Sequence, residues 1–328
     1  MKKKDNEKIK KKRGKKVMII IGIILAILAT LMLIGFIINS ILSKDELEDI
    51  APYGQMVDIN GEKMHVYSMG DGEETIVLLP GFGVSLPSAD FGPLMRELSE
   101  KHTVVAVEYF GVGFSDQTDT PRTNENYTNE IRTALEKAGF NPPYILMPHS
   151  YSGIHSEYYA NKYPDEIKGI IMLDTTSSAE TESKRTPSFL YSIAKFQQTV
   201  GITRLAMSLM PETKLLENGY TEKEISDYLT FNFHVINDSL VNQSDLMVDN
   251  IKEVSTLDFP SNIPVLKIIS SDTIKNLAKL KKDDGMGYQT EHINRLGNNA
   301  SYKIVDGSHF IYQSKAAEIV ELMENFFN

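Results

Sequence analysis

The sequence contains no cysteine among its 328 residues. It therefore has no disulfide bonds, no thiolate ligands for zinc or iron–sulfur clusters, and no cysteine nucleophile. An H-E-x-x-H motif, an EF-hand loop and a G-x-G-x-x-G turn after a strand are also missing. We therefore expect neither a bound metal nor an organic cofactor.

Positive charge is scarce outside the first 16 residues. The whole chain has a net charge of −10, but residues 1–16 carry ten Lys or Arg and only two acids. The remaining residues therefore have a net charge of −18. A domain this acidic repels phosphates, so nucleic acid is not an expected partner.

No charged residue occurs between Val17 and Leu42. The most apolar part, Val17–Ile38, would form a helix of about 33 Å, which is enough to cross a hydrocarbon layer of about 30 Å. The alternative is a cleaved signal peptide, but such peptides have a shorter apolar region followed by an A-x-A-like site. We predict a single-pass cell-membrane protein with a cytoplasmic N-terminus and an extracellular domain after Lys44, because the basic flank precedes the span.

After residue 54, short apolar runs alternate with helical patterns, which is typical of βαβ units on a mostly parallel sheet. Asn60-Gly61 predicts a hairpin turn at the start. The expected strands are 55–59, 64–68, 75–79, 103–107, 144–147, 169–173, 265–269 and 302–305. The expected helices between and after them are 91–100, 126–138, 153–163 and 314–327.

The alternation stops between residues 175 and 260, where the sequence shows only helical patterns. Thr221 and Glu224 fit a capping box at one helix start. An ordinary crossover needs far fewer residues, so we interpret this stretch as an inserted helical cap. The expected organisation is a basic tail (1–16), a transmembrane helix (17–42), a linker (43–54), a core (55–174 and 261–328) and the cap (175–260).

The segment from Tyr144 to Gly153 carries the clearest chemical signal. An apolar strand leads into Pro-His-Ser-Tyr-Ser-Gly and then into a helical pattern. This is the context of a nucleophile elbow, in which a serine occupies a sharp turn between strand and helix. Ser150 is the candidate nucleophile. The usual pattern is G-x-S-x-G, and Pro148 at the first glycine position is unusual because it fixes φ and lacks an N–H group.

Three other segments follow strand candidates in the order that this chemistry requires. They are Val77-Leu-Leu-Pro-Gly-Phe-Gly83, Val107-Glu-Tyr-Phe-Gly-Val-Gly-Phe-Ser-Asp116 and Val305-Asp-Gly-Ser-His-Phe310. In the first, the amide of Phe82 can form an oxyanion hole with the amide of Tyr151, the residue after the serine. In the last, His309 is the candidate general base.

With these motifs in this order, residues 52–328 resemble the α/β-hydrolase superfamily, in its serine-nucleophile, capped esterase, lipase or peptidase-like branch. The resemblance implies an α/β fold with a mostly parallel eight-stranded sheet flanked by helices. The family usually has His-Gly where this chain has Pro80-Gly81, and Asp where it has Glu108. These departures affect positioning more than chemistry.

The resemblance also implies a Ser-His-Asp triad of Ser150, His309 and an acid. The family places its acid at the end of the strand before the histidine strand, which favours Asp272. Asp272 comes about one residue early for the family's spacing, so Asp174 stays open as an alternative, as do Asp283 and Asp284.

The expected function is a membrane-anchored serine hydrolase that cleaves an ester, an amide or a thioester through an acyl-enzyme. Its expected partners are the membrane and a small acyl substrate, which can be lipid-like. Two alternatives stay open: a proline-releasing aminopeptidase on the same scaffold, and a non-catalytic binding or scaffold protein that kept the fold.

Overall fold

A computed structural model describes residues 2–179, 184–281 and 284–328 of the chain. The described residues divide into two compact units. One unit contains the residues up to Asp49 together with Ser192–Met210, and the other contains Ile50–Tyr191 and Pro211–Asn328. We refer to the second as the catalytic unit, because it holds the candidate triad described below.

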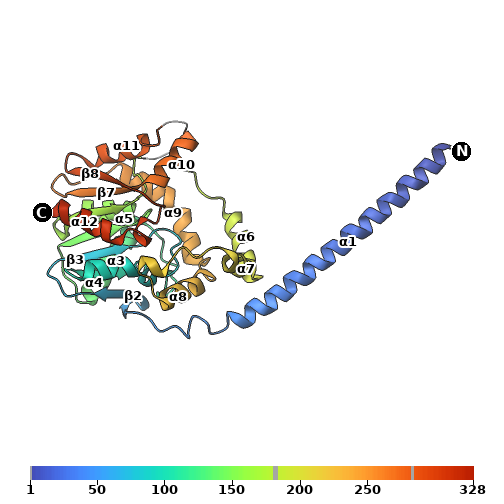
Figure 1. Ribbon diagram of the computed structural model, residues 1–328, viewed down its shortest axis with the longest axis horizontal. Helices are drawn as coiled ribbons and strands as arrows, with labels where there is room; N and C mark the ends of the chain where they lie inside the picture. Colours follow the sequence, from blue (N-terminus) through green and yellow to red (C-terminus); the bar gives the residue numbers. More distant parts are fainter. Residues whose placement is uncertain (1, 180–183, 282–283) are drawn as a thin grey trace. The chain divides into compact units, whose positions relative to one another are not determined.

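An eight-stranded sheet forms the centre of the catalytic unit (Figure 1). The strand order is β1-β2-β4-β3-β5-β6-β7-β8, and β3 to β8 are parallel, whereas β2 is antiparallel to both neighbours. This confirms the predicted mostly parallel α/β sheet. The strands are β1 (Gln55–Ile59), β2 (Glu62–Met69), β3 (Thr75–Leu79), β4 (Thr103–Val107), β5 (Tyr144–Pro148), β6 (Ile167–Leu173), β7 (Val265–Ser270) and β8 (Ala300–Val305).

Helices cover both faces of the sheet, which explains why its central strands are apolar on both sides. Alternate residues of β3 illustrate this: Val77 and Leu79 pack in one apolar core with helices α4 and α5, whereas Ile76 and Leu78 pack in another with α3 and α12. These helices are α3 (Gly92–Ser99), α4 (Asn124–Lys137), α5 (Ser152–Lys162) and α12 (Ala316–Phe327), and a short helix, α2 (Pro87–Asp90), precedes α3.

Local signals fix several element ends as the sequence predicts. Asn60 and Gly61 both have positive φ in the turn between β1 and β2, the conformation that favours Asn-Gly in tight hairpins. The predicted capping box is also present at the start of α8 (Glu222–Asn232), where Thr221 and Glu224 satisfy each other's amides.

The region between β6 and β7 contains four helices in its described part: α6 (Ser188–Thr199), α7 (Ile202–Leu209), α8 and α9 (Asp238–Ser255). Two further helices, α10 (Ser271–Lys281) and α11 (Gly287–Leu296), lie between β7 and β8, where no helix was expected from the sequence. Short 3-10 turns occupy Pro164–Glu166, Leu216–Asn218 and Ile311–Gln313.

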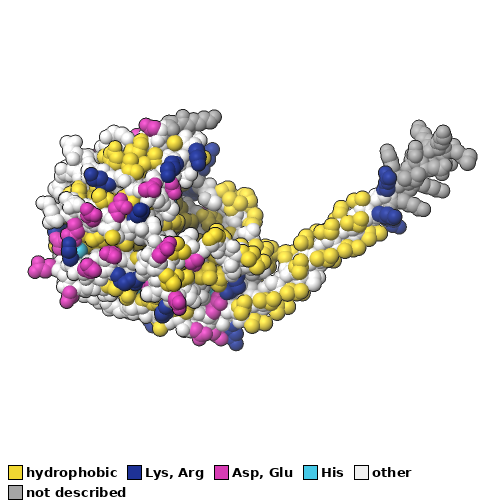
Figure 2. Space-filling model, in the orientation of Figure 1, with side chains coloured by type: hydrophobic (Ala, Val, Ile, Leu, Met, Phe, Trp, Pro, Cys, Tyr) yellow, Lys and Arg dark blue, Asp and Glu magenta, His cyan; other side chains and the backbone are white. Residues whose placement is uncertain are grey.

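Helix α1 (Lys2–Leu42) contains the uncharged run. Within its segment Arg13–Leu42, the most apolar window of 18 residues has a mean hydropathy of 3.2 and no buried residue. Figure 2 shows apolar side chains along most of this helix, with basic side chains near its N-terminal end. The helix is long and apolar enough to cross a membrane, and a signal sequence has the same properties.

Candidate active site

Ser150 lies in a sharp turn between β5 and α5. Its φ is +52°, in the left-handed region that is rare for residues other than glycine. The turn is held from two sides, because the Ser150 amide donates to the Leu173 carbonyl at 3.1 Å and the Ser150 carbonyl accepts from the Thr176 amide at 3.0 Å. This is the geometry of a nucleophile elbow, with the serine at its apex.

The second and third residues after the serine, Ser152 and Gly153, must be small because α5 starts against two other loops. A Cβ added to Gly153 would lie 2.6 Å from the Cβ of Thr175. The Ser152 hydroxyl donates to the Pro80 carbonyl and lies 2.9 Å from the Tyr109 hydroxyl. Pro148 ends β5 opposite Leu79 and is tolerated there, because the next amide, that of His149, makes the ladder bond to Leu79 at 2.9 Å.

The structure brings His309 to Ser150. His309 follows β8, and its Nε2 lies 2.9 Å from the Ser150 Oγ. Its side chain is 40% exposed, so solvent and substrate can reach the imidazole. The distance is within the range for direct proton transfer between a nucleophile and its base.

Asp174, not Asp272, is the carboxylate beside the imidazole. Asp174 follows β6, and its Oδ2 lies 2.6 Å from the His309 Nδ1. Its side chain is fully buried and also accepts from the Ser270 amide at 2.9 Å and from the Thr273 hydroxyl at 2.5 Å. These donors fix the direction of the carboxylate, as a group that orients a histidine tautomer requires.

The expected placement of Asp272 is wrong, because α10 begins directly after β7. Asp272 lies in the first turn of this helix, is 50% exposed and pairs with Lys275 at 2.8 Å. The end of β7 contributes Ser270 to the site instead, and the first turn of α10 contributes Thr273, both as donors to Asp174. Asp284 accepts from the Met286 amide, and Asp283 lies outside the described residues.

The loop after β3 lies directly against the serine. A Cβ added to Gly81 would be 2.9 Å from the Ser150 Cβ and 2.7 Å from the His149 Nδ1, so only glycine fits without displacement. In the described part of the chain, the amides of Phe82 and Tyr151 have no hydrogen-bond partner. Two free amides beside a nucleophile are the arrangement that an oxyanion hole needs.

His149 lies beneath the elbow and is buried. Its Nε2 donates to the His309 carbonyl at 3.1 Å, and its ring centroid is 4.7 Å from that of His309. Burial, followed by the neighbouring His309, lowers the pKa of His149 to about 3. The ring is therefore neutral at physiological pH, and it supports the His309 loop without adding charge to the site.

A buried polar cluster holds the segment that follows Asp174. The Ser178 hydroxyl donates to Glu157 of α5 at 2.6 Å, and the His292 Nε2 donates to the same carboxylate at 2.8 Å. Lys267 of β7 donates to the His292 Nδ1 at 2.6 Å. Burial lowers the pKa of Lys267 to about 7 and that of His292 to about 4. No local sequence pattern reveals this cluster, because its members are far apart in the chain.

Cap helix α9 packs on the same side of the core as the candidate oxyanion amides. The Tyr151 hydroxyl donates to the Met247 carbonyl at 3.2 Å. Phe82, Met247 and Leu257 pack against one small apolar cluster, whose members are Tyr151, Ile154, Tyr158, Ile251 and Val254. Apolar side chains of the elbow helix α5 and of α9 therefore pack together next to the residue that follows Ser150.

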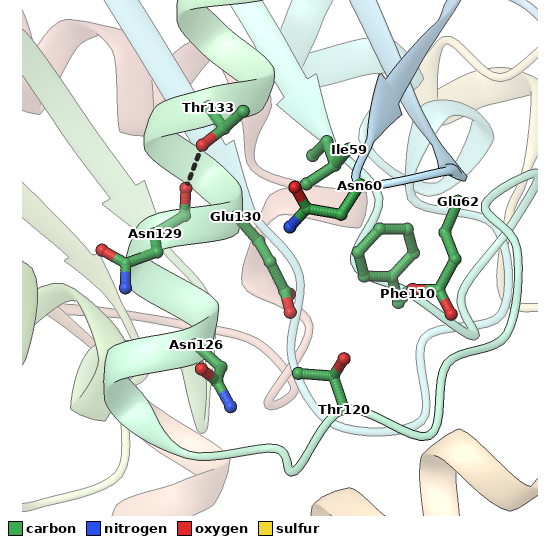
Figure 3. A pocket seen from close by; sticks show the side chains of 9 residues that line it. All are labelled: Ile59, Asn60, Glu62, Phe110, Thr120, Asn126, Asn129, Glu130 and Thr133. Carbon is green, nitrogen blue, oxygen red and sulfur yellow. Dashed lines mark hydrogen bonds between the residues drawn. The ribbon is translucent and has the colours of Figure 1, made fainter.

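A polar pocket of about 200 Å³ lies elsewhere in the catalytic unit, between α4 and the turn after β1 (Figure 3). Its lining includes Glu130, Glu62, Asn60 and no triad residue. Both Glu130 oxygens accept from Arg122, at 2.9 and 2.7 Å. This carboxylate is therefore committed to an ion pair and does not make the pocket a second catalytic centre.

Comparisons with known proteins agree with the fold. A family model described as alpha/beta hydrolase fold matches residues 74–208. The Bacillus subtilis (strain 168) protein YbdG, which is uncharacterised, is 28% identical over 317 residues, covering 95% of this chain and 97% of YbdG. The 2-(acetamidomethylene)succinate hydrolase of Mesorhizobium japonicum is 33% identical over 127 residues, which span 39% of this chain and 44% of that enzyme.

The fold is shared with solved structures as well. An epoxide hydrolase from Vigna radiata, VrEH1, superimposes with a TM-score of 0.61 at 17% identity, covering 85% of this chain and all of the other. Sheet order, elbow and family model lead to one conclusion: the chain has the α/β-hydrolase fold, and its residues 74–208 match the model of that family.

Proposed function

We propose that this protein is a membrane-anchored serine hydrolase that cleaves an ester of an apolar acyl group. The observation that carries the proposal is the continuous hydrogen-bonded chain from Ser150 through His309 to Asp174. A serine at the elbow distinguishes it from the branches that use a carboxylate nucleophile, as in the epoxide-hydrolase mechanism.

In the first half of the proposed reaction, the Ser150 Oγ attacks the ester carbonyl carbon while its proton passes to the His309 Nε2. The carbonyl oxygen becomes an oxyanion, which accepts hydrogen bonds from the amides of Phe82 and Tyr151. The bond between carbon and the alcohol oxygen then breaks, and His309 returns the proton to the leaving alcohol. Asp174 stabilises the imidazolium throughout.

In the second half, a water molecule attacks the acyl-enzyme, and His309 accepts one of its protons. The bond between the acyl carbon and the Ser150 Oγ breaks, and the serine recovers the proton from His309. The products are a carboxylic acid, an alcohol and the free enzyme.

Helix α1 is proposed as the membrane anchor, with its N-terminus in the cytoplasm and the catalytic unit outside. Basic residues precede the apolar run and acidic residues follow it, which favours this orientation. We expect alkaline carbonate to leave the full chain in the membrane pellet. Release would contradict the anchor but not the hydrolase.

A fluorophosphonate probe tests the hydrolase, because it reacts covalently only with an activated serine. Full chain in detergent micelles should be labelled, and Ser150→Ala should abolish labelling. The matched control is Ser99→Ala, since the Ser99 hydroxyl bonds the Arg96 carbonyl at the end of α3. A folded wild type that is not labelled would favour the non-catalytic scaffold instead.

Substrate pairs with the same acyl group then separate ester from amide cleavage. We expect hydrolysis of a medium-chain acyl ester to exceed that of the matching anilide. Cleavage confined to peptides with an N-terminal proline would favour the aminopeptidase and contradict the ester proposal.

A further inference from the structure

Residues Ser192–Met210, which form the end of α6 and all of α7, belong to the same compact unit as α1. We call them the cap hairpin. We propose that this hairpin is embedded in the outer leaflet of the membrane, with lipid acyl chains filling the groove between it and α1. The inference rests on the proposed anchoring of α1, and its test separates the two.

A close backbone contact joins the hairpin to the apolar run of α1. A Cβ added to Gly35 would lie 2.5 Å from the Val200 carbonyl oxygen, and one added to Gly201 would lie 3.3 Å from the Gly35 carbonyl oxygen. Gly201 also has a φ of +76°, which suits glycine. Small residues that let two backbones approach are typical of helix packing within membranes.

Asn39 of α1 forms hydrogen bonds with carbonyl groups at the C-terminal end of α6. Its Nδ2 donates to the Gln198 and Thr199 carbonyls at 3.1 and 3.3 Å, and its Oδ1 accepts from the Arg204 Nε at 2.9 Å. Terminal carbonyls of a helix lack partners within the helix, and in hydrocarbon they need a donor from protein. An amide in an otherwise apolar span provides that donor here.

The charge of Arg204 is directed toward the end of the span. Its Nη2 donates to the Ser43 hydroxyl at 3.1 Å and to Glu46 at 2.5 Å, and both partners lie beyond the apolar run. A long cationic side chain at a membrane boundary reaches toward the polar interface in this way. The arrangement would be unnecessary for a residue surrounded by water.

The hairpin also exposes six large apolar side chains among the described residues, next to the polar Ser192, Lys195, Gln197, Thr199 and Ser208. The apolar ones are Ile193, Phe196, Ile202, Leu205, Leu209 and Met210. An open groove of about 630 Å³ lies between α1 residues 28–39 and hairpin residues 200–208. Contact of water with so many large apolar side chains is energetically unfavourable.

The depth of the contact identifies hydrocarbon as that occupant. The groove extends along α1 from Leu28 to Asn39, within the uncharged run. From Ile38 back to Leu28 is about 15 Å along the helix, or half of a hydrocarbon layer about 30 Å thick. A hairpin packed there reaches the outer half of the bilayer if α1 spans it.

The absence of cysteine from the sequence makes accessibility a clean test. Full chain carrying Leu205→Cys, Leu280→Cys or Leu25→Cys would be reconstituted in phosphatidylcholine vesicles and treated with a membrane-impermeant maleimide. Leu280 is 79% exposed on the catalytic unit, so a cysteine there gives the labelling rate of a position in water. Leu25 lies in the middle of the span and gives the labelling rate of a position in the membrane. Full labelling in dodecyl sulfate and an unchanged far-ultraviolet circular dichroism spectrum control for reactivity and folding.

We expect labelling of the Leu205→Cys variant to be slower than that of Leu280→Cys by about tenfold or more, as for Leu25→Cys. Fast labelling at 205 with protection at 25 would overturn the hairpin while leaving the anchor intact. Fast labelling at both positions would overturn the anchor and the inference that rests on it.

A second probe identifies what covers the hairpin. The chain has no tryptophan, so Leu205→Trp gives a single tryptophan, which is excited at a wavelength that the 15 tyrosines do not absorb. Its fluorescence should be quenched when the vesicles contain brominated phosphatidylcholine. Protection from maleimide without quenching would indicate a protein partner, including a second copy, and would overturn the lipid assignment.

A matched glycine pair tests the packing. Gly35→Leu would force the backbones apart, whereas a side chain at Gly22 meets nothing within 4 Å. We expect Gly35→Leu, but not Gly22→Leu, to raise the labelling rate of Leu205→Cys. Equal rates in both backgrounds would contradict the contact from which the inference is drawn.

Discussion

Replacement of the buried carboxylate by an amide gives the most direct test of the site. Asp174→Asn keeps the size and shape of the side chain, and asparagine tolerates the φ of +45° at this position. The amide can donate to the His309 Nδ1, which then holds the wrong tautomer and can no longer present an acceptor Nε2 to Ser150. The stabilising negative charge is lost as well.

The expected loss is large, because the wild-type carboxylate is fully buried and 2.6 Å from the imidazole. The same substitution in a serine triad typically lowers kcat by about 10⁴. We expect a decrease of about 10³ to 10⁴, or about 4 to 5.5 kcal/mol at 1.36 kcal/mol for each tenfold change. KM should change little, since the buried carboxylate does not touch substrate.

Asp272→Asn is the matched control, since it makes the same chemical change at the position expected from sequence. Asp272 is half exposed and pairs only with exposed Lys275 among the contacts of the described residues, and such surface pairs contribute about 0 to 1 kcal/mol. We expect kcat within about twofold of wild type.

The assay is steady-state ester hydrolysis by detergent-solubilised full chain, with the melting temperature of each variant measured in parallel. A folded Asp174→Asn variant that keeps more than about a tenth of wild-type kcat would refute the assigned role. A large loss in Asp272→Asn with wild-type stability would return the acid to the end of β7.

Two other predictions concern the oxyanion loop and acid stability. Gly81→Ala should lower kcat by about 10² to 10³ and lower the melting temperature as well, because its Cβ would press on Ser150 and His149 and displace the Phe82 amide; a folded variant with wild-type kcat would contradict the oxyanion role. Burial lowers the pKa values of His149 and His155 to about 3, below the ordinary 6.5, so the folded state binds fewer protons than the unfolded state as pH falls. The contribution of each histidine to the free energy of unfolding is complete above pH 6.5 and decreases below it, by about 2 kcal/mol for each histidine at pH 5. Urea unfolding of wild type and His155→Gln at pH 7 and pH 5 tests this. The variant should take up about one proton fewer on unfolding, so its free energy of unfolding should fall less between pH 7 and pH 5 than that of wild type. An equal fall in both proteins would contradict the prediction.

Several features of the site follow from local sequence patterns. The elbow around Ser150 is encoded by an apolar strand, a short turn and a helical pattern within ten residues, and His309 follows the last apolar strand in the same way. Strand and helix positions were predictable for the same reason, because period and turn chemistry act over a few residues. The helices α10 and α11 were not expected from the sequence; α10 begins at Ser271, directly after β7 ends at Ser270, so no turn residue separates the strand from the helix.

The choice of acid depended on tertiary structure. Strands β6, β7 and β8 are neighbours, so carboxylates at the ends of both β6 and β7 come near a histidine that follows β8. Only the start of α10 at Ser271 turns Asp272 outward and directs Thr273 toward Asp174.

By itself, the sequence determined the apolar span, the α/β alternation, the serine and the histidine, because each depends on residues close together in the chain. The tertiary structure alone decided which carboxylate lies beside His309, the glycine contact between α1 and the cap hairpin, and the buried cluster around Glu157. Each of these joins residues that are distant in sequence, and their proximity arises from packing, which no local pattern encodes.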